Sequence, residues 1–416
     1  MELTLLGTGA PGGLPRPDCP CASCATAIGE DARASTSLLV DGALLLDLTP
    51  GIAFAAARAG HSLSGVRQVL LSHPQNGPAL EVPAGLPAPG RVPDGRELAL
   101  ISGHRVRSVP VDAPGSGYEV TAPDAGHTGV PRPSGVPLRL LYLPPDCSPA
   151  GPVEGANGAA SGPYAMVLLD VLGRPDALAK LRATGAVTAT TDVIAVHIDH
   201  TIPQGPELQR QLAAAGARAV PDGETLHVGE YHAIPEPPRR TLVLGGARSG
   251  KSVEAERRLS AFPGVVYVAT SGTREGDPEW AARIGTHRER RPSSWKTVET
   301  CDLVPLLAAD GPPLLVDCLA LWLTDAMDAV DAWDDHAWTR GGERALRERV
   351  DALASAFRET RRTVVAVSNE VGSGVVPATA SGRRFRDELG RLNTRVADEC
   401  EQVLLVTAGQ ALRLRG

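Results

Sequence analysis

The residues with the clearest chemical meaning form a phosphate-binding loop. Residues 245–252 read GGARSGKS and fit the pattern G-x-x-x-x-G-K-[ST]. The glycines allow backbone N–H groups to turn toward phosphate oxygens, and the start of the following helix favours negative charge. Lys251 is expected to reach the outer phosphates and Ser252 to bind Mg²⁺. We therefore expect the nucleotide to be bound by Gly245, Gly246, Ala247, Arg248, Ser249, Gly250, Lys251 and Ser252.

Two further side chains could take part in phosphoryl chemistry. Asp317 ends the apolar run LLVD, where P-loop enzymes carry an acidic residue that manages the metal, although an Asp here could also simply begin a turn. His287 follows Glu279 and Arg283 at intervals of four, so the three would share one helix face. A neutral imidazole can attack phosphorus, and arginines can hold phosphates. Taken alone, a solvated surface histidine is the simpler interpretation of His287.

A third group of reactive side chains is Cys19, Cys21 and Cys24. The chain has seven cysteines, an odd number that does not fit a secreted disulfide framework. The clustered three are either reduced thiols in a proline-rich loop or metal ligands. The other four are scattered, at Cys147, Cys301, Cys318 and Cys400. The last two lie in or beside apolar stretches and are expected to be inert core residues.

Regular elements surround the phosphate loop. Short apolar runs at 241–246, 265–270, 313–318, 363–370 and 402–409 predict five strands. Helical sequence follows the loop to about Leu259, covers 278–290, follows 318, and continues at 344–361 and 385–399. In 344–361 the apolar positions are Leu346, Val350, Leu353 and Phe357. Strands that alternate with helices predict a mostly parallel sheet with helices on both faces.

The sequence before this region predicts a separate, sheet-rich α/β or α+β domain. Strands are expected at 3–9, 36–48, 68–72, 138–143, 165–170 and 193–197, and a helix at 205–214. The stretch 229–240 has prolines, charge and no periodicity, which predicts a linker. The expected domains are therefore 1–228 and 241–416.

Composition limits the function classes. With 416 residues, 43% hydrophobic and 21% charged, the chain is typical of a globular protein with two or three domains. It has no apolar run of about 18 residues and no signal-peptide pattern at its start, so we expect a cytoplasmic protein without a membrane span. A net charge of −7 argues against a nucleic-acid partner.

Six motifs in order carry a family resemblance. GGARSGKS, YVATSG, ARIGTHRERRPSSWKTVE, LVDCLALWLT, SNEVGSGVVP and RRFRDELGRLN closely resemble the adenosylcobinamide kinase / adenosylcobinamide-phosphate guanylyltransferase family of cobalamin biosynthesis. The resemblance spans 241 to about 409. It departs at Asp325, where the family has Asn, and at 409–411, where it has Gly-x-Pro. Within the last two motifs, a structural role is an equal alternative for Gly372, Gly374, Arg383, Arg386 and Asp387.

The resemblance implies a RecA-like P-loop fold and two reactions. A nucleoside triphosphate, ATP or GTP, would phosphorylate the aminopropanol hydroxyl of adenosylcobinamide. GTP would then guanylylate His287 with release of pyrophosphate, and the GMP would pass to adenosylcobinamide phosphate, giving adenosylcobinamide-GDP. His287 and Lys251 would be catalytic, Glu299 and Asp317 would bind nucleotide, and Ser252 and Asp317 would hold Mg²⁺. A homo-oligomer is also expected.

The N-terminal region resembles metallo-β-lactamase-fold cyclic phosphodiesterases of phosphonate metabolism, which implies an αββα domain over 1–228. The matching segments are LTLLGTGAPGGLPRPDCPCASC, LLLDLTPG, VLLSHPQNG, VLLDVLGRP and VHIDH. The metal motif H-x-H-x-D-H is reduced to His73, followed by Gln75, Gly77 and Pro78. With Asp170 and His197 as the remaining ligands, a dinuclear centre that activates water is not expected.

A different metal set is complete in this domain. In the resembled family, a structural site separate from the catalytic one is formed by the positions that match Cys19, Cys21, Cys24 and His200. Three thiolates and one imidazole make a full tetrahedral zinc set. Zinc would pin the N-terminal loop to the strand end at His200 in a domain that no longer does chemistry.

Three functions follow from these patterns. The first is the bifunctional kinase and guanylyltransferase with a degenerate N-terminal domain. The second is a P-loop small-molecule kinase that lacks the guanylyl step. In the third, the N-terminal domain is a non-enzymatic binding or scaffold module for a corrinoid or a pathway partner.

Overall fold

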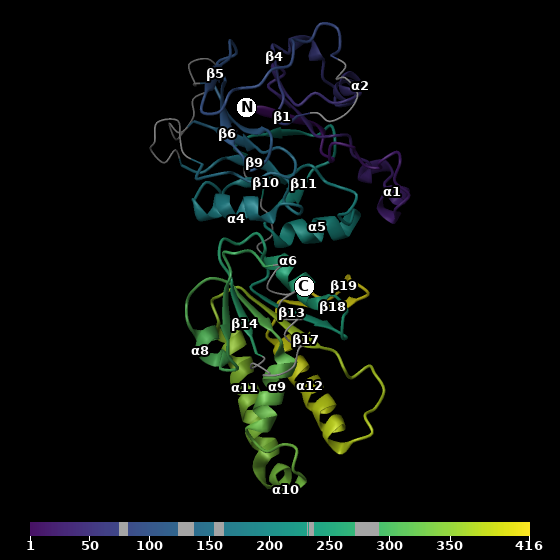
Figure 1. The fold of residues 1–416 in the computed structure, drawn as a ribbon, viewed down its shortest axis with the longest axis vertical. Helices are drawn as coiled ribbons and strands as arrows, with labels where there is room; N and C mark the ends of the chain where they lie inside the picture. The colour runs from purple at the N-terminus through teal and green to yellow at the C-terminus, as the bar shows by residue number, and fades with distance from the viewer. Residues whose placement is uncertain (75–81, 124–136, 154–161, 231, 233–236, 271–290) are drawn as a thin grey trace. The chain divides into compact units, whose positions relative to one another are not determined.

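The chain divides into two compact units, Met1–Glu236 and Pro237–Gly416. The computed structural model describes residues 1–74, 82–123, 137–153, 162–230, 232, 237–270 and 291–416 (Figure 1). Each unit has its own sheets and its own hydrophobic core. The division falls within the stretch 229–240, for which proline and charge predict a linker.

Two mixed β-sheets form the N-terminal unit. Their strand orders are β12-β1-β2-β3-β4 and β11-β10-β9-β8-β7-β6-β5. In the first sheet β3 and β4 are parallel and the other neighbours antiparallel; in the second, β8 to β11 are parallel and β5 to β8 antiparallel. The strands are β1 (Glu2–Gly7), β2 (Ser37–Val40), β3 (Leu44–Leu46), β4 (Gln68–Leu70), β5 (Glu97–Ala99), β6 (Arg105–Pro110), β7 (Ser116–Thr121), β8 (Arg139–Tyr142), β9 (Met166–Leu169), β10 (Asp192–Ala195), β11 (Arg218–Ala219) and β12 (Thr225–His227).

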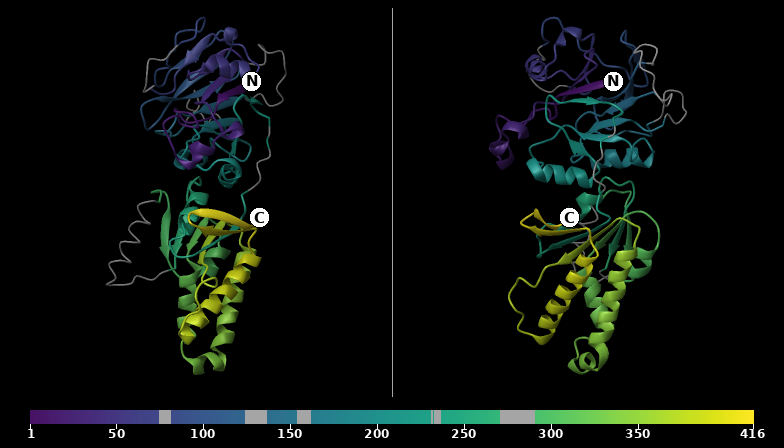
Figure 2. Two further views of the ribbon diagram at one scale, coloured as in Figure 1. Left: turned by 90° about the vertical axis from the view of Figure 1, so that its right-hand side faces the viewer. Right: turned by 180° about the vertical axis from the view of Figure 1, so that it is seen from behind.

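The two sheets pack face to face between layers of helix. Leu38 of β2 belongs to the core shared with Tyr118 and Tyr142 of the second sheet, whereas its neighbour Leu39 packs with Ile52 of a helix on the outer face. This alternation follows from the two-residue period of a strand. Figures 1 and 2 show α4 and α5 along the outer face of the second sheet. The helices are α1 (Ala22–Thr26), η1 (Gly29–Asp31), α2 (Ile52–Arg58), η2 (Leu63–Gly65), α4 (Pro175–Ala183) and α5 (Gly205–Ala214). The αββα expectation is therefore confirmed.

The prediction of one strand over 36–48 is wrong. The structure has two antiparallel strands, β2 and β3, joined by a tight turn. Asp41 and Gly42 have φ angles of 44° and 65°. Asp-Gly with two positive φ angles is the signature of a hairpin turn whose twist matches that of the strands. The signal was therefore present in the sequence.

One seven-stranded sheet forms the C-terminal unit, with the order β15-β14-β16-β17-β13-β18-β19. Six neighbouring strands are parallel and β19 is antiparallel to β18. The five predicted strands are all present. The strands are β13 (Arg240–Gly245), β14 (Val266–Ala269), β15 (Lys296–Glu299), β16 (Leu314–Asp317), β17 (Val364–Asn369), β18 (Gln402–Thr407) and β19 (Gln410–Arg415).

Helices cover this sheet on both sides. Among the described helices, α6 packs against β13 and β17, while α8, α9, α11 and α12 pack with one another on the other side (Figure 1). The predicted periodicity of α11 is confirmed, since Leu346, Val350, Leu353 and Phe357 are all buried. The helices are α6 (Lys251–Leu259), α8 (Leu303–Ala308), α9 (Leu319–Asp328), α10 (Asp335–Ala337), the π-turn η3 (Trp338–Gly342), α11 (Glu343–Glu359) and α12 (Ala380–Asp398). The predicted helix 278–290 lies outside the described residues.

Helix α12 begins five residues earlier than the prediction of 385. Thr379 caps it, because its Oγ1 accepts a hydrogen bond of 3.1 Å from Gly382 N. Among the described residues, no helix is long and apolar enough to cross a membrane.

Candidate functional site

The phosphate loop and the predicted acidic residues lie at one edge of the parallel sheet. Gly245 ends β13 and pairs with Asn369 at the end of β17. Ala269, the last residue of β14, pairs with Asp317 on one side and with Glu299 on the other. Carboxyl ends of parallel strands are the usual ligand-binding edge of such sheets. The sheet register thus brings Gly245, Glu299 and Asp317, which span 72 residues of sequence, to one edge of the sheet.

The loop 245–252 is a tight backbone turn that opens α6. Arg248 and Gly250 have positive φ angles of 59° and 99°. Gly250 is the N-cap of α6, so the first backbone N–H groups of that helix are available to an anion. The turn after β18 supports the loop from behind, since Gly409 N donates to Ser249 O at 2.9 Å. The arrangement is that of a phosphate cradle.

Gly245 fits its position because it has no side chain. A Cβ atom there would lie 2.4 Å from Ser249 Oγ and 2.7 Å from Val406 O. The Val406 carbonyl belongs to the neighbouring strand β18 and cannot swing aside. By contrast, a Cβ on Gly246 would meet no atom within 4 Å. The first glycine of the loop is therefore required for packing, whereas the second is exposed.

Lys251 is buried at the start of α6. Its Nζ donates to Gly246 O at 3.1 Å, within the loop itself. Its charge also acts on Cys318, which follows the last residue of β16. Burial, and after it the charge of Asp317, raise the pKa of this thiol to about 11, whereas the charge of Lys251 lowers it. The ammonium group and the carboxylate of Asp317 therefore act on the same thiol.

Asp317 is held by a tyrosine that sequence analysis did not identify. Tyr267 Oη donates to Asp317 Oδ2 at 2.8 Å. Burial, followed by the charge of Asp317, raises the pKa of Tyr267 well above its usual value, so the phenol remains a donor. The guanidinium carbon of Arg291 lies 3.2 Å from the centroid of the Tyr267 ring, a cation–π contact. In the sequence Tyr267 lies within an apolar run, and such a run indicates a buried strand and no polar role for the tyrosine.

The segment after β17 is tied to the same edge. Glu370 N donates to Gly245 O at 3.1 Å, and Ser368 Oγ donates to Asn393 Oδ1 at 2.6 Å. Asn393 Nδ2 in turn donates to Asn369 O at 3.0 Å. The asparagine at the end of the RRFRDELGRLN motif is thus a buried link between α12 and β17.

The other residues of the last two motifs have local partners. Gly372 N donates to the carboxylate of Glu370 at 2.8 Å, and Arg383 donates to the carbonyl groups of the preceding turn. Arg386 pairs with its neighbour Asp387 at 3.0 Å. Glu299 lies exposed at the end of β15. His287 lies outside the described residues.

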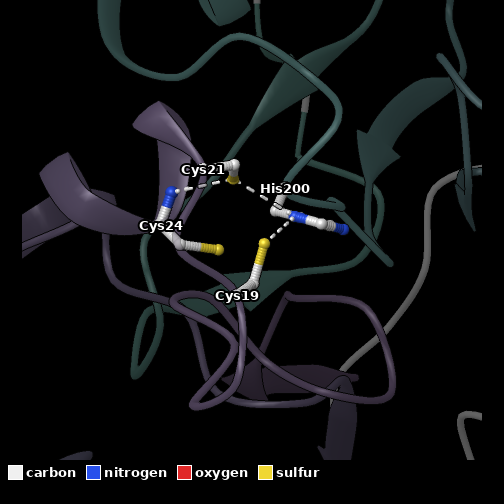
Figure 3. A group of neighbouring side chains, drawn as sticks. All are labelled: Cys19, Cys21, Cys24 and His200. Carbon is white, nitrogen blue, oxygen red and sulfur yellow. Dashed lines mark hydrogen bonds between the residues drawn. The ribbon is translucent and has the colours of Figure 1, made fainter.

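The N-terminal unit contains a compact metal-ligand set (Figure 3). One donor atom from each of Cys19, Cys21, Cys24 and His200 lies within 4.8 Å of the others. His200 Nδ1 is 3.2 Å from Cys19 Sγ and 3.4 Å from Cys21 Sγ. The backbone N–H of Cys24, followed by His200, lowers the pKa of Cys21 to about 6. This stabilises the thiolate, the form in which cysteine binds metal. His200 Nε2 lies 3.6 Å from Asp199 Oδ1, which accepts a hydrogen bond of 2.9 Å from Thr201 N.

The remaining positions that match the metallo-β-lactamase-fold family, His73 and His197, and the buried Asp47 of the LLLDLTPG segment have other partners. Asp47 is buried and accepts hydrogen bonds from Ser72 N, Ser72 Oγ and Tyr142 Oη at 2.6–2.7 Å. His73 Nδ1 is 2.9 Å from Ser72 Oγ, and His197 Nε2 is 3.1 Å from Leu143 O. Burial lowers the pKa of His197 to about 3.

Asp170 does not complete a centre either. It accepts a hydrogen bond of 2.8 Å from Gly173 N, and burial raises its pKa to about 6. In the part of the chain that the structure describes, the cysteine–histidine set is the one group of three or more metal-ligand side chains that converges. Gln75, Gly77 and Pro78 lie outside that part.

Comparison with known proteins relates the C-terminal unit to one family. The family described as "Cobinamide kinase / cobinamide phosphate guanyltransferase" matches residues 241–414. The bifunctional adenosylcobalamin biosynthesis protein CobU of Salmonella typhimurium is 38% identical over 180 residues, which are 42% of this chain and 98% of that protein. The protein CobP of Pseudomonas aeruginosa, described by the same words, is 42% identical over 183 residues, with the same coverage.

The solved structures that match this chain have lower sequence identity to it than the proteins named above. Zinc-bound PqqB from Methylobacterium extorquens is 19% identical, with a TM-score of 0.37, and the match covers 55% of this chain and 100% of that one. A diphosphatase of the PhnP family is 21% identical, with a TM-score of 0.38, and the match covers 54% of this chain and 97% of that one.

The packing around Gly245 predicts an asymmetry between the first two glycines of the loop. Gly245→Ala should lower the free energy of unfolding by about 1–3 kcal/mol, because the new methyl group overlaps a backbone carbonyl of β18. The matched variant Gly246→Ala should change it by less than about 0.5 kcal/mol. All five tryptophans lie in the C-terminal unit, so tryptophan fluorescence during urea unfolding reports on this unit alone. Equal stability of the two variants without nucleotide would contradict the packing argument.

Proposed function

The chain belongs to the cobinamide kinase / cobinamide phosphate guanyltransferase family, and from this we propose that its C-terminal unit carries out both reactions in cobalamin biosynthesis. In the first, the hydroxyl of adenosylcobinamide attacks the γ-phosphorus of ATP or GTP, giving adenosylcobinamide phosphate and a nucleoside diphosphate. In the second, GTP and adenosylcobinamide phosphate give adenosylcobinamide-GDP and pyrophosphate. The observation that carries the proposal is the phosphate loop at the same strand edge as Asp317, inside the matched region.

The guanylyl transfer proceeds in two steps on His287. A ring nitrogen of the neutral imidazole attacks the α-phosphorus of GTP, the bond to the β-phosphate oxygen breaks, and pyrophosphate leaves. The terminal phosphate oxygen of adenosylcobinamide phosphate then attacks the same phosphorus, the P–N bond breaks, and the imidazole is regenerated. Both steps develop negative charge on the oxygens of the α-phosphate, and the N–H groups of the loop and Lys251 would stabilise this charge.

The donors at the strand edge fit a magnesium ion. Ser252 supplies a hydroxyl and Asp317 a carboxylate, and such oxygen ligands are those that Mg²⁺ prefers. The ion would neutralise phosphate charge in both reactions. Tyr267 donates a hydrogen bond to Asp317 Oδ2, and the carboxylate of Asp317 would hold the metal or its water. Glu299, at the end of β15, is assigned to nucleotide binding from its place in the motif.

The cysteine–histidine set fits zinc, and we assign it a structural role. Zinc prefers thiolate and imidazole ligands in tetrahedral geometry, with four protein ligands in structural sites. The lowered pKa of Cys21 and the mutual approach of the four donor atoms support this choice over free thiols. Because Asp47, His73 and His197 are engaged with other groups, the N-terminal unit is proposed to be non-catalytic.

The partners in this proposal are the two corrinoid substrates and the nucleotides ATP and GTP, without nucleic acid. A cytoplasmic location fits this need for nucleoside triphosphates. The homo-oligomer stays a prediction, which light scattering of the full chain would test.

The first test concerns the covalent intermediate. Incubation of the full chain with GTP labelled at the α-phosphate and Mg²⁺ should give a protein adduct that is acid-labile and alkali-stable, as expected for a P–N bond. His287→Ala should lose the adduct, while the exposed His336→Ala should keep it. Kinase activity with adenosylcobinamide should persist in both. Equal labelling of His287→Ala and wild type would refute the assigned nucleophile, and an unlabelled wild type would favour a simple kinase.

The second test concerns the metal carboxylate. Tyr267→Phe removes one hydrogen bond to Asp317 but keeps the ring that Arg291 contacts. A hydrogen bond to a charged group contributes about 1.5 kcal/mol, so the Mg²⁺ concentration at half-maximal kinase rate should rise about tenfold. Mn²⁺ binding to the nucleotide complex, followed by electron paramagnetic resonance, should weaken in parallel. Unchanged metal dependence in a variant with wild-type unfolding would show that the tyrosine does not position Asp317.

The third test concerns zinc. Elemental analysis of the full chain, purified in zinc-containing medium, should find zinc bound, and the pair Cys19→Ser with Cys24→Ser should abolish it. Cys147→Ser is the matched control, because this buried thiol lies in the same unit outside the set and burial raises its pKa to about 11. Zinc retained by the double variant would refute the assignment.

A further inference from the structure

Thr270 is a buried polar residue beside the point where the chain leaves β16. It follows Ala269, the last residue of β14, and is 2% exposed. Ala269 pairs with Asp317 across the sheet, so Thr270 lies next to the end of β16. A hydroxyl that is removed from water forms its hydrogen bonds within the protein, and the partners of Thr270 show what it holds in place.

The hydroxyl of Thr270 binds both backbone polar groups of Cys318. Thr270 Oγ1 accepts a hydrogen bond of 2.9 Å from Cys318 N and donates one of 2.6 Å to Cys318 O. Cys318 is the residue directly after Asp317 and the N-cap of α9. One side chain of the β14 segment thus holds the backbone at the turn from β16 into α9.

The backbone of Thr270 forms two further hydrogen bonds. Thr270 N donates to Asp317 O at 3.3 Å, and Cys301 Sγ donates to Thr270 O at 3.1 Å. The peptide group between Asp317 and Cys318 is therefore held at its carbonyl by the backbone of Thr270 and at its N–H by the hydroxyl. Because a side chain starts from its own Cα, holding this peptide group limits the directions in which the Asp317 carboxylate can point.

Two residues of one segment thus restrain Asp317 in different ways. Tyr267 Oη donates to the carboxylate itself at 2.8 Å, whereas Thr270 holds the adjoining peptide group. Mg²⁺ demands near-ideal octahedral geometry, so the groups that bind it must be well placed. Residues that orient a metal ligand raise metal affinity although they do not contact the ion.

We propose that Thr270 is a positioning residue for the carboxylate of Asp317, which deepens the proposed function and rests on the magnesium role assigned to Asp317 there. The hydroxyl is the group required, because a side chain of the same shape without it loses both hydrogen bonds to Cys318. Thr270 acts through the backbone next to Asp317, and contacts neither the ion nor the nucleotide in this assignment.

The test compares two replacements of Thr270. Thr270→Val keeps the branched shape and removes the hydroxyl, whereas Thr270→Ser keeps the hydroxyl. Mn²⁺ binding to the full chain with ADP present, followed by electron paramagnetic resonance, should weaken about tenfold or more in Thr270→Val, as is usual when a group that orients a metal ligand is removed. Thr270→Ser should bind Mn²⁺ like the wild type. In the kinase reaction, the Mg²⁺ concentration at half-maximal rate should rise in parallel for Thr270→Val, while kcat at saturating Mg²⁺ stays close to the wild-type value.

The matched control is Thr360→Val. Thr360 is similarly buried, at 3% exposure, and its Oγ1 accepts a hydrogen bond of 3.3 Å from Arg362 N. It precedes the start of β17, whereas the phosphate loop follows the end of the parallel neighbour β13. This variant should bind Mn²⁺ like the wild type, even if urea unfolding shows that both valine variants are less stable.

Wild-type Mn²⁺ affinity in a folded Thr270→Val variant would overturn the proposal, as would an equal loss in Thr360→Val or in Thr270→Ser. If Thr270→Val does not fold, Thr270→Cys takes its place, because a thiol is a weaker donor and acceptor than a hydroxyl. This variant should weaken Mn²⁺ binding, and an unchanged affinity would again count against the role of Thr270.

Failure of the proposed function gives a different result. A wild type that binds Mn²⁺ with the nucleotide but does not phosphorylate adenosylcobinamide would contradict the kinase reaction, and the comparison of the Thr270 variants would still decide the role of this residue. A wild type that binds the nucleotide without Mn²⁺ would overturn the metal role of Asp317 and, with it, the role of Thr270.

Discussion

The C-terminal unit depends on a backbone contact that leaves no room for a side chain. Gly245 lies so close to β18 that a methyl group would overlap the Val406 carbonyl. This approach lets β13 stay in register with β17 and β18 up to its last residue and still turn sharply into α6. Asp317, Glu299 and Asn369 take their positions from that register, because they are the last residues of parallel strands in the same sheet.

How much of this unit can be predicted from sequence depends on burial. Central strands such as β16 are buried on both faces, and burial requires apolar side chains. Their sequences are therefore apolar runs, which is why the five strands predicted from such runs are all present. The two missed strands, β15 and β19, form the edges of the sheet and are largely exposed, with the sequences KTVE and QALRLR. An edge strand has little apolar sequence to reveal it. Short α8 and the cap at Thr379 were missed for a similar reason, since local signals are weak over a few residues.

Prediction of the sites from sequence has a second limit, because sequence patterns do not show which distant residues are in contact. Motif patterns placed the phosphate loop and Asp317 at one edge, but not the hydrogen bond from Tyr267, because a tyrosine in an apolar strand looks like core. Likewise, the strand pattern gave no sign that Ser368 and Asn393 join β17 to α12. In the N-terminal unit, four metal-ligand positions could be named in advance, yet only the fold shows that their donor atoms converge and that Asp47 accepts hydrogen bonds from Ser72 and Tyr142.

The cysteine–histidine set also has a consequence for how the N-terminal unit folds. Cys19 and His200 are separated by 181 residues, so a metal ion held between them closes a loop of nearly the whole unit. Closing so long a loop removes conformational entropy from the unfolded chain, and the gain grows with the logarithm of loop length. Pairing of β1 with β12 joins the same two ends. With the ion bound, the unit would therefore unfold as one cooperative body, and neither end could fray without releasing the other.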